Sequence, residues 1–301
     1  MEGLVLRIDA KVCHVQVEGR VHALPLRGKL FAVDPAQKRP IAVGDRVRVT
    51  LDGQGGAIDE VLPRTSKLAR RAAGEDGREQ VLAANVNQVL VVAAITEPRF
   101  EPLLVDQILA GAERERLPAL LAITKVDRDR HERAPHWRAV YERLGYPVHL
   151  TTLKHPETFE PVRAALKDRI TVLCGTSGVG KSSLLNALVP GLDLKTGKLG
   201  RSDLGRHTTT HTQLLALPGG GHVLDTPGIR AFFLHGVDPA ELPHWFREFQ
   251  PLLSRCAYSD CSHLVEPECP VRAAAHDGSI APSRYASYRA MHEDHDRGRR
   301  R

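Results

Sequence analysis

The sequence predicts three successive domains: an N-terminal β-barrel over residues 1–68, a central α/β domain over 69–234 and a mainly helical segment over 235–301. Three observations predict this order. The first part is rich in short strands with glycine and proline between them, which is typical of small barrels. In the second part, apolar runs of strand length alternate with helical spacing, as in an α/β domain. The third part becomes helical and carries three cysteines beside a histidine.

The composition limits the class of protein. The chain has 301 residues, of which 42% are apolar, and this length is enough for two or three domains with sizeable cores. No stretch approaches the ~18–20 consecutive apolar residues of a membrane helix. The N-terminal segment MEGLVLRIDAKV also lacks the basic-then-apolar order of a secretory signal. We therefore expect a cytoplasmic protein that has no membrane partner. We also expect a monomer.

The first domain predicts an OB-fold barrel. Apolar and polar residues alternate over 43–51, as expected of a half-buried strand. Residues 15–18 and 21–24 predict a hairpin with Gly19 and Arg20 as its two-residue turn. Several short strands of this kind, separated by turn residues, favour an OB-fold over other small barrels.

The charge distribution favours a polyanionic partner. The chain carries 42 basic and 36 acidic residues, a formal net charge of +6, which places polyanions ahead of acidic proteins as partners. Residues 1–67 hold 11 Lys and Arg against 8 Asp and Glu, with Phe31 as their one aromatic residue. Base stacking needs aromatic side chains. We therefore expect this domain to contact RNA through backbone phosphates.

After a polar, glycine-containing linker over residues 70–80, the chain predicts an α/β domain. Residues 89–95 form a continuous apolar run, typical of a parallel strand covered on both faces. Residues 119–123 and 170–174 are two further runs of this type, and residues with helical spacing lie between them. The third strand runs directly into a glycine-rich loop.

That loop, residues 175–182, matches the phosphate-loop spacing G-x-x-x-x-G-K-[ST] in full. It follows a strand and opens a helix over 183–188, the context that confirms the motif. Its glycines let backbone N–H groups turn toward phosphate oxygens, and the helix N-terminus adds partial positive charge. We expect Lys181 to bridge the β- and γ-phosphates and Ser182 to bind Mg²⁺.

A second magnesium ligand is expected about forty residues downstream, in Asp225-Thr226-Pro227-Gly228. Asp225 ends a short strand, and an aspartate at a strand end beside a tight turn suits the task of holding Mg²⁺. Gly219, Gly220 and Gly221 predict a hairpin turn just before that strand.

The segment Thr124-Lys125-Val126-Asp127 is the expected base-recognition segment. The Asp127 carboxylate can accept both the ring N–H and the exocyclic amine of guanine, a donor pair that adenine lacks. Lys125 would lie along the purine face. The first residue of this motif is usually Asn in GTPases, so Thr124 predicts reduced affinity with guanine selection retained.

The order of these motifs predicts a circular permutation. The base-recognition segment precedes the phosphate loop by about fifty residues, whereas it follows the loop in ordinary GTPases. A site is defined in space, so the same sheet can be built from a permuted chain whose old ends are joined. Residues 150–152 then occupy the place of a second base-contacting loop.

Catalysis is expected from residues 205–210, Gly-Arg-His-Thr-Thr-Thr. Thr209, or else Thr208, could close over the γ-phosphate and Mg²⁺ as a switch. Ile229 follows the Asp225 motif where many GTPases carry a water-orienting Gln. An apolar side chain cannot orient water, so His207 is the best candidate for that task.

The cysteine-rich segment predicts a structural zinc site. Cys256, Cys261, His263 and Cys269 lie within fourteen residues and supply a full tetrahedral set for one Zn²⁺, with no position left open for catalysis. In a reducing compartment such a cluster is more often metal-binding than disulfide-bonded.

Taken together, these motifs closely resemble the ribosome small subunit-dependent GTPase A family of circularly permuted GTPases, over nearly the whole chain. The resemblance is strongest in residues 175–183, 205–210 and 225–228 and in the Cys-Cys-His-Cys spacing, and it includes residues 83–88. It implies an OB-fold N-terminal domain, GTP hydrolysis stimulated by the small ribosomal subunit, and a role in late maturation of that subunit. It also implies that His207 is catalytic.

Two functions therefore remain open at this point. One is a GTPase activated by the small ribosomal subunit and its rRNA. The other is an RNA-binding module whose site holds GDP or GTP as a structural switch without turnover; Ile229 leaves room for it. The residues expected to bind nucleotide are Thr124, Lys125, Val126, Asp127, Gly175, Thr176, Ser177, Gly178, Val179, Gly180, Lys181, Ser182, Ser183, Asp225 and Gly228. The residues expected to act in catalysis are His207, Lys181 and Thr209. The expected metal ligands are Cys256, Cys261, His263 and Cys269 for zinc, and Ser182, Thr209 and Asp225 for magnesium.

Overall fold

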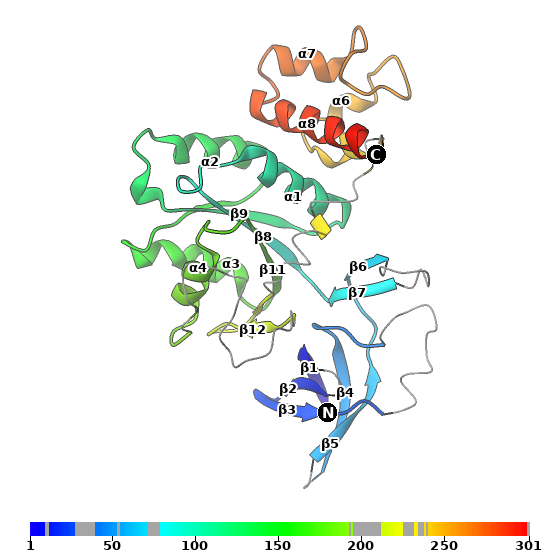
Figure 1. Cartoon of the computed structure of the whole chain (residues 1–301), viewed down its shortest axis with the longest axis vertical. Coiled ribbons are helices and arrows are strands. Elements are labelled where there is room, and N and C mark those ends of the chain that lie inside the picture. The colour runs from blue at the N-terminus through cyan, green and yellow to red at the C-terminus, as the bar shows by residue number, and fades with distance from the viewer. Residues whose placement is uncertain are drawn as a thin grey trace. The chain divides into compact units, whose positions relative to one another are not determined.

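The computed structural model (Figure 1) describes residues 1–9, 12–27, 40–52, 55–71, 79–192, 194, 212–224, 232–233, 238 and 240–299. The chain forms two compact units, each assembled from separate segments. The first unit comprises Met1–Gln88, Arg163–Leu173 and Gly200–Ile229. The second comprises Val89–Val162, Cys174–Leu199 and Arg230–Arg301. In the described part of the chain, no helix is long and apolar enough to cross a membrane.

The N-terminal segment forms a curled, five-stranded antiparallel sheet, as predicted for an OB-fold. Its strands are β1 (Glu2–Ile8), β2 (Cys13–Val17), β3 (Arg20–Leu24), β4 (Arg46–Asp52) and β5 (Gly55–Val61), in the order β3-β2-β1-β4-β5. A bridge between Leu26, just after β3, and Ile58 of β5 brings the two edges of the sheet together. Alternate residues such as Val5, Val15 and Val47 are buried inside the curl.

The hairpin between β2 and β3 lies one residue away from its predicted position. Val17 pairs with Arg20, so Glu18 and Gly19 form the turn rather than Gly19 and Arg20. Both turn residues have positive φ angles, 48° and 80°, which is the geometry of a two-residue turn matched to the twist of the strands. The position of the glycine in such a turn decides the register of the two strands. The apolar alternation alone did not reveal which register is adopted.

The ends of the predicted linker 70–80 belong to strands rather than to a linker. Strands β6 (Lys67–Arg71) and β7 (Glu79–Ala84) pair antiparallel and include four of its residues. Asn85, which follows β7, joins this ribbon to the barrel: its side-chain amide donates to the Gly44 carbonyl at 2.9 Å and accepts from the Thr65 N–H at 2.9 Å.

The second unit contains two of the predicted parallel strands, 89–95 and 119–123, and one further strand that was not predicted. These are β8 (Gln88–Ala94), β9 (Ala119–Thr124) and β10 (Val148–Leu150), with β8 and β10 each parallel to β9. All residues of β8 and β9 are buried, which confirms the prediction of strands covered on both faces. Helices α1 (Pro102–Arg114) and α2 (Arg133–Arg143) cover one face and α4 (Lys181–Leu188) the other (Figure 1).

The first unit holds the strands that flank the predicted phosphate and magnesium motifs. Strand β11 (Ile170–Cys174) pairs parallel with β13 (His222–Leu224), and β13 pairs antiparallel with β12 (Leu214–Ala216). The predicted hairpin turn at Gly219–Gly221 is confirmed, since all three glycines have positive φ. At Gly221 a side chain would also overlap the carbonyl of Leu166, the last residue of α3 (Glu160–Leu166).

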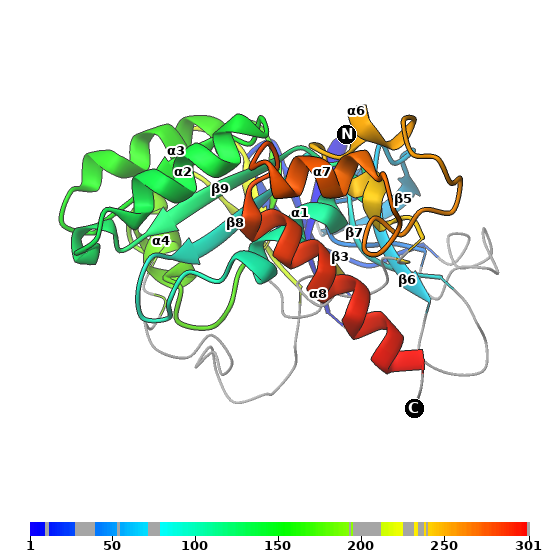
Figure 2. The ribbon, with the colours of Figure 1, turned by 90° about the horizontal axis from the view of Figure 1, so that it is seen from above.

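The C-terminal segment is mainly helical, as predicted. Among its described residues are η4 (Leu242–Trp245), α6 (Gln250–Leu253), α7 (Pro270–His276) and α8 (Pro282–Arg299). Phe246, Phe249 and Tyr288 are fully buried and form its aromatic core. Helix α8 packs beside α1 (Figure 2), which attaches this segment to the α/β part of the same unit.

Candidate nucleotide site and metal cluster

The phosphate loop has backbone conformations that favour glycine. It begins where β11 ends at Cys174 and finishes at Gly180, which precedes the first residue of α4. Gly178 and Gly180 have φ angles of 80° and 98°, a region that L-residues rarely occupy. At Gly175, a Cβ atom would overlap the carbonyl oxygen of Val92 in β8. The glycines of the motif are therefore needed both for the turn and for close packing of the loop.

Lys181 lies over this loop. Its ammonium group donates to the carbonyl oxygens of Gly175 and Thr176, at 3.0 and 2.7 Å, and the residue is buried. Ser182 is buried beside it, in the first turn of α4. Lys181, predicted to bind phosphate, and Ser182, predicted to bind magnesium, therefore both lie at the N-terminus of α4. The partial positive charge of this helix end favours an anion there.

The base-recognition segment lies directly against the phosphate loop. Thr124, at the end of β9, donates its hydroxyl to the Val179 carbonyl at 2.5 Å. Lys125 donates its ammonium to the Gly178 carbonyl at 2.8 Å and to the Glu97 carbonyl. These contacts join residues 55 and 53 positions apart. The two motifs therefore meet in space although their order along the chain is reversed.

Thr124 has a defined task in this arrangement. Its hydroxyl fills the space beside Gly180, where a Cβ atom would lie 3.4 Å from the Thr124 oxygen. The departure from Asn thus retains a hydrogen bond that ties the end of β9 to the phosphate loop. The amide donor of Asn is lost, and the predicted effect on affinity stays a prediction.

Asp127 is held as an ionised acceptor. Thr152 donates its hydroxyl to Oδ1 at 2.7 Å, and the Lys154 ammonium lies 3.3 Å from Oδ2. The Thr152 hydrogen bond lowers the pKa of the Asp127 carboxyl; burial opposes this effect and Lys154 adds to it. The carboxylate is therefore charged at neutral pH, as acceptance of two guanine donors requires.

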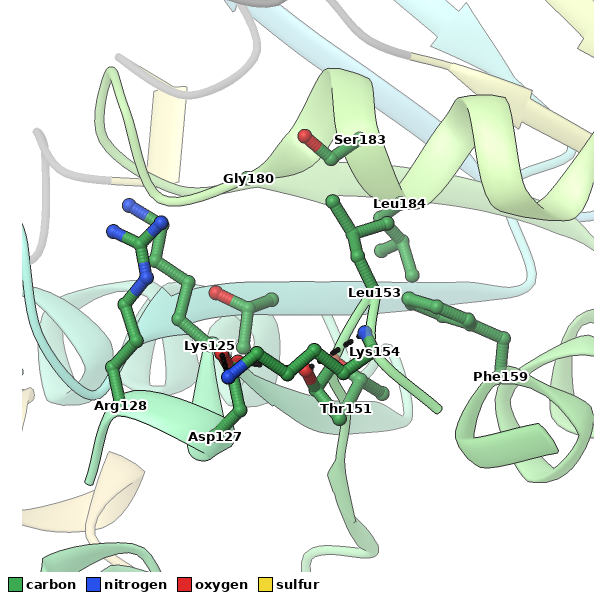
Figure 3. A pocket seen from close by; sticks show the side chains of 12 residues that line it. Lys125, Asp127, Arg128, Thr151, Leu153, Lys154, Phe159, Gly180, Ser183 and Leu184 are labelled. Carbon is green, nitrogen blue, oxygen red and sulfur yellow. Dashed lines mark hydrogen bonds and ion pairs between the residues drawn. The ribbon is translucent and has the colours of Figure 1, made fainter. Parts of the chain in front are cut away.

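These groups surround one cavity of about 330 Å³ (Figure 3). Its volume lies at the lower end of the range for small-molecule sites, roughly 300–1,000 Å³. Asp127 and Lys125 lie on one side of it, and the apolar side chains of Leu184 and Phe159 lie on the other. The lining residues are Thr124, Lys125, Asp127, Arg128, Thr151, Thr152, Leu153, Lys154, Phe159, Gly180, Ser183 and Leu184.

Sequence reasoning identified part of this lining. Residues 150–152 were expected to be a second base-contacting loop, and Thr152 does contact Asp127. Lys154, Phe159 and Leu184 were missed, because a single basic or apolar residue near a motif carries no spacing signal. Only the fold shows that these three side chains line the same cavity.

The predicted zinc ligands come together in the C-terminal segment. One ligand atom from each of Cys256, Cys261, His263 and Cys269 lies within 4.8 Å of all the others. His263 Nδ1 lies 3.5 Å from the Cys256 sulfur and 3.3 Å from the Cys269 sulfur. Separations of this size, together with three thiols and one imidazole, fit a tetrahedral zinc site.

The loop that carries these ligands is held by hydrogen bonds from α8 and by hydrogen bonds within the loop. Tyr285 and Tyr288, both on α8, donate to the carbonyls of His263 and Ser262 at 2.8 and 2.6 Å. The Glu266 carboxylate accepts the Ser262 N–H at 2.7 Å. Burial raises the pKa of this carboxyl, but the hydrogen bonds from Ser262 and neighbouring N–H groups together outweigh burial and lower the pKa to about 2. Burial lowers the pKa of His263, which keeps the imidazole neutral for a metal.

The remaining predicted site residues lie outside the described part of the chain. They are His207, Thr208, Thr209, Asp225, Gly228 and Ile229. Their expected roles in magnesium binding and catalysis stay predictions.

Known proteins resemble this chain over most of its length. The family model described as RsgA GTPase matches residues 61–235. The small ribosomal subunit biogenesis GTPase RsgA of Gemmatimonas aurantiaca is 41% identical over 298 residues, which span 97% of this chain and 96% of that protein.

Two solved structures resemble the fold over nearly its full length. YjeQ from Thermotoga maritima is 35% identical with a TM-score of 0.80, and the match covers 97% of both chains. YloQ, described as a circularly permuted GTPase, is 27% identical with a TM-score of 0.76, over 98% of this chain and 95% of that one. These matches confirm the resemblance, the permutation and the GTPase activity expected from the sequence. The chain belongs to the RsgA GTPase family.

Proposed function

We propose that this protein binds GTP with Mg²⁺ and hydrolyses it to GDP and phosphate during biogenesis of the small ribosomal subunit. One observation carries the proposal: the base-recognition segment and the phosphate loop are joined through Thr124 and Lys125. A cavity lies against both segments. The base and the phosphates of one nucleotide would therefore be bound by a single preorganised element.

Guanine selection is assigned to Asp127. Its ionised carboxylate would accept the ring N–H and the exocyclic amine of the base, with Thr152 fixing its orientation. The Lys125 ammonium is engaged by the carbonyls of Gly178 and Glu97, so its methylene groups are the part available to the purine face. Leu184 and Phe159 would supply apolar contacts to the ring.

Phosphate binding is assigned to residues 175–183. Lys181 would bridge the β- and γ-phosphates, and backbone N–H groups of the loop would bind the remaining oxygens. Mg²⁺ would be held by Ser182, Thr209 and Asp225 and would neutralise charge on the transferred phosphoryl group. Gly228 would contact the γ-phosphate side of the same site.

Water positioning is assigned to His207, because Ile229 offers no hydrogen-bonding group. Positioning and charge stabilisation are the main means by which phosphoryl transfer is accelerated. His207→Ala should leave GTP affinity nearly unchanged and remove most of the subunit-stimulated rate. If that variant is stimulated as strongly as the parent protein, the water is positioned by another group.

One structural Zn²⁺ is assigned to Cys256, Cys261, His263 and Cys269. It would fix the loop between α6 and α7 without taking part in hydrolysis. We propose that the chain consists of an RNA-contacting barrel (residues 1–68), a GTPase domain (69–234) and this zinc-binding segment (235–301).

The partner is proposed from the relatives and from charge. The curated relatives are named small ribosomal subunit biogenesis GTPases, and the net charge of +6 suits an rRNA surface. A monomer acting on the small subunit in the cytoplasm fits this partner.

The deciding experiment is GTP turnover measured with and without purified small ribosomal subunits, at fixed salt. A low basal rate and a clear rise with subunits are expected. Tight GTP binding without turnover under both conditions would instead identify an RNA-binding switch.

A further inference from the structure

The β12–β13 hairpin is placed between the two segments that the proposed mechanism needs most. Leu224, the last residue of β13, directly precedes Asp225. At the other end, Gln213 precedes β12 and follows the threonine-rich residues 205–210 closely. Leu214 and Leu224 are paired across the hairpin. The hairpin is therefore continuous in sequence with Asp225 at one end and close in sequence to residues 205–210 at the other.

The outward face of the N-terminal sheet contacts this hairpin within the same unit. Gln16 of β2 accepts a hydrogen bond from His222 Nε2 of β13 at 3.0 Å. The backbones of Arg7 in β1 and Gln213 form an antiparallel bridge. Cys13, Val15 and Val17 point into the barrel core, so Gln16 lies on the opposite side of its strand.

His222 is suited to a fixed, uncharged contact. It is half-buried, and this burial lowers the pKa of its imidazole, so the ring is neutral near pH 7. A neutral ring with its proton on Nε2 donates to the Gln16 side-chain carbonyl. The hydrogen bond is therefore present under the conditions in which the enzyme would work.

A second set of hydrogen bonds connects the barrel to β11, the strand that pairs with β13. Asn85 binds the Gly44 carbonyl in the barrel. Two residues later, Asn87 accepts the Ile170 N–H at 2.7 Å through its side chain, and its own N–H donates to the Ile170 carbonyl at 2.8 Å. Because hydrogen bonds connect the barrel to both β11 and β13, we expect the barrel and these two strands to move together.

We propose that Gln16 and His222 are positioning residues: they transmit binding of the small subunit at the barrel to the hairpin that leads into Asp225. This inference rests on the proposed function, because it concerns the stimulated rate. Neither residue lines the cavity assigned to the nucleotide or belongs to the Cys-His cluster. Their effect would be on the position of the chain segments next to the hairpin.

The test compares Gln16→Ala, His222→Ala and the double variant with the parent chain, using purified small subunits and GTP. Each single variant should lower the stimulated kcat about fivefold, the effect of one neutral hydrogen bond of about 1 kcal/mol. The basal rate, the affinity for a fluorescent GDP and the subunit concentration at half-stimulation should stay within about twofold of the parent values. The double variant should lose no more than either single variant, because both remove the same bond.

Gln16→Glu is the matched control. It keeps an acceptor oxygen toward His222 and should restore most of the stimulated rate. A stimulated kcat that stays at the parental value in Gln16→Ala would overturn the inference, as would a parallel fall of the basal rate. If the parent chain itself is not stimulated by subunits, the proposed function fails rather than this inference.

Discussion

Two aspartates of the molecule are in opposite environments. One belongs to the base-recognition segment beside the cavity, and the other lies between α1 and α8. Asp127 lies at the cavity, and hydrogen bonding by Thr152 lowers the pKa of its carboxyl. Asp106, on α1, is fully buried, and burial raises the pKa of its carboxyl against the opposing effects of its polar neighbours, Arg284 among them.

The partners explain the difference. Asp106 accepts from the Arg284 guanidinium at 2.6 Å and from the Tyr141 hydroxyl at 2.9 Å. Arg284 also pairs with Glu248 at 2.7 Å. Both of these hydrogen bonds to Asp106 reach the same oxygen, Oδ1, and the network attaches the C-terminal segment to α1. Asp127 keeps acceptor capacity beside the cavity, which a recognition group needs. The comparison separates a buried carboxylate that holds the fold from a carboxylate that lines the cavity.

Among the variants of groups that hold the fold, substitution of a zinc ligand should have the largest effect. Cys261→Ala should lower the zinc content from one ion per chain to well below one and unfold the C-terminal segment, because structural zinc supplies about 10 kcal/mol or more in small zinc domains. Elemental analysis and limited proteolysis of residues 235–301 would measure this.

Nucleotide affinity of the Cys261→Ala chain should remain close to that of the parent protein. Cys13→Ala is the control, since Cys13 lies in the barrel core and its loss should leave one zinc bound. A folded parent protein without bound metal, purified without chelators, would contradict the zinc assignment.

Arg284→Met should come next, with a loss of about 3–5 kcal/mol in the free energy of unfolding, because it leaves two buried carboxylates without their cation. Denaturant titration followed by tryptophan fluorescence would measure this loss. Arg289→Met is the matched control on the same helix: its ion pair with Glu293 is exposed and is worth about 0–1 kcal/mol. Equal losses in the two variants would remove the distinction drawn for Asp106.

Asp127→Asn tests the ligand-binding side. Loss of two charge-assisted hydrogen bonds should weaken GTP binding at least about a hundredfold, or about 2.7 kcal/mol, and shift preference toward xanthine nucleotides, whose C2 carbonyl suits an amide donor. Competition binding with GTP, XTP and ATP would measure it. Asp129→Asn is the control, because Asp129 accepts backbone N–H groups at the start of α2 and does not line the cavity. Equal affinity of the parent protein for ATP and GTP would refute the assignment.

Thr152→Val should give the smallest effect. It removes the hydrogen bond that most lowers the pKa of Asp127, so that pKa should rise toward its ordinary value of 3.8. Binding needs the ionised carboxylate, so GDP affinity should begin to fall at a higher pH than in the parent protein as the solution is acidified. At pH 7 the loss should be about three- to tenfold. Thr151→Val, whose hydroxyl contacts the Ile123 carbonyl instead, should leave the pH profile unchanged.

The sequence predicted the parts of the molecule that depend on local spacing. The phosphate loop, the Cys-Cys-His-Cys cluster and the hairpin at Gly219–Gly221 are short motifs whose backbone or ligand requirements are visible in consecutive residues. The reversed order of the base-recognition segment and the phosphate loop was also visible in the sequence. The hydrogen bond between Lys125 and Gly178 confirms that the two segments are neighbours in space.

Contacts between distant side chains were not predictable in this way. Arg284 and Asp106 lie 178 residues apart, and Asp127 and Thr152 lie 25 apart, with no periodicity that links either pair. The turn at Glu18–Gly19 was misplaced by one residue for a different reason: apolar alternation fits two registers, and only the positive φ angles of the turn select one.

The joint between Thr124 and Val179 also has a consequence for synthesis of the chain. During translation, the base-recognition segment is made before the phosphate loop, and N-terminal parts of a chain generally fold first. The nucleotide site is nevertheless incomplete until α4, which ends at Leu188, has left the ribosome. GTP stabilises only a state that binds it. A nascent chain that ends before α4 therefore gains no stability from cellular GTP, and its barrel and first strands must persist on their own contacts.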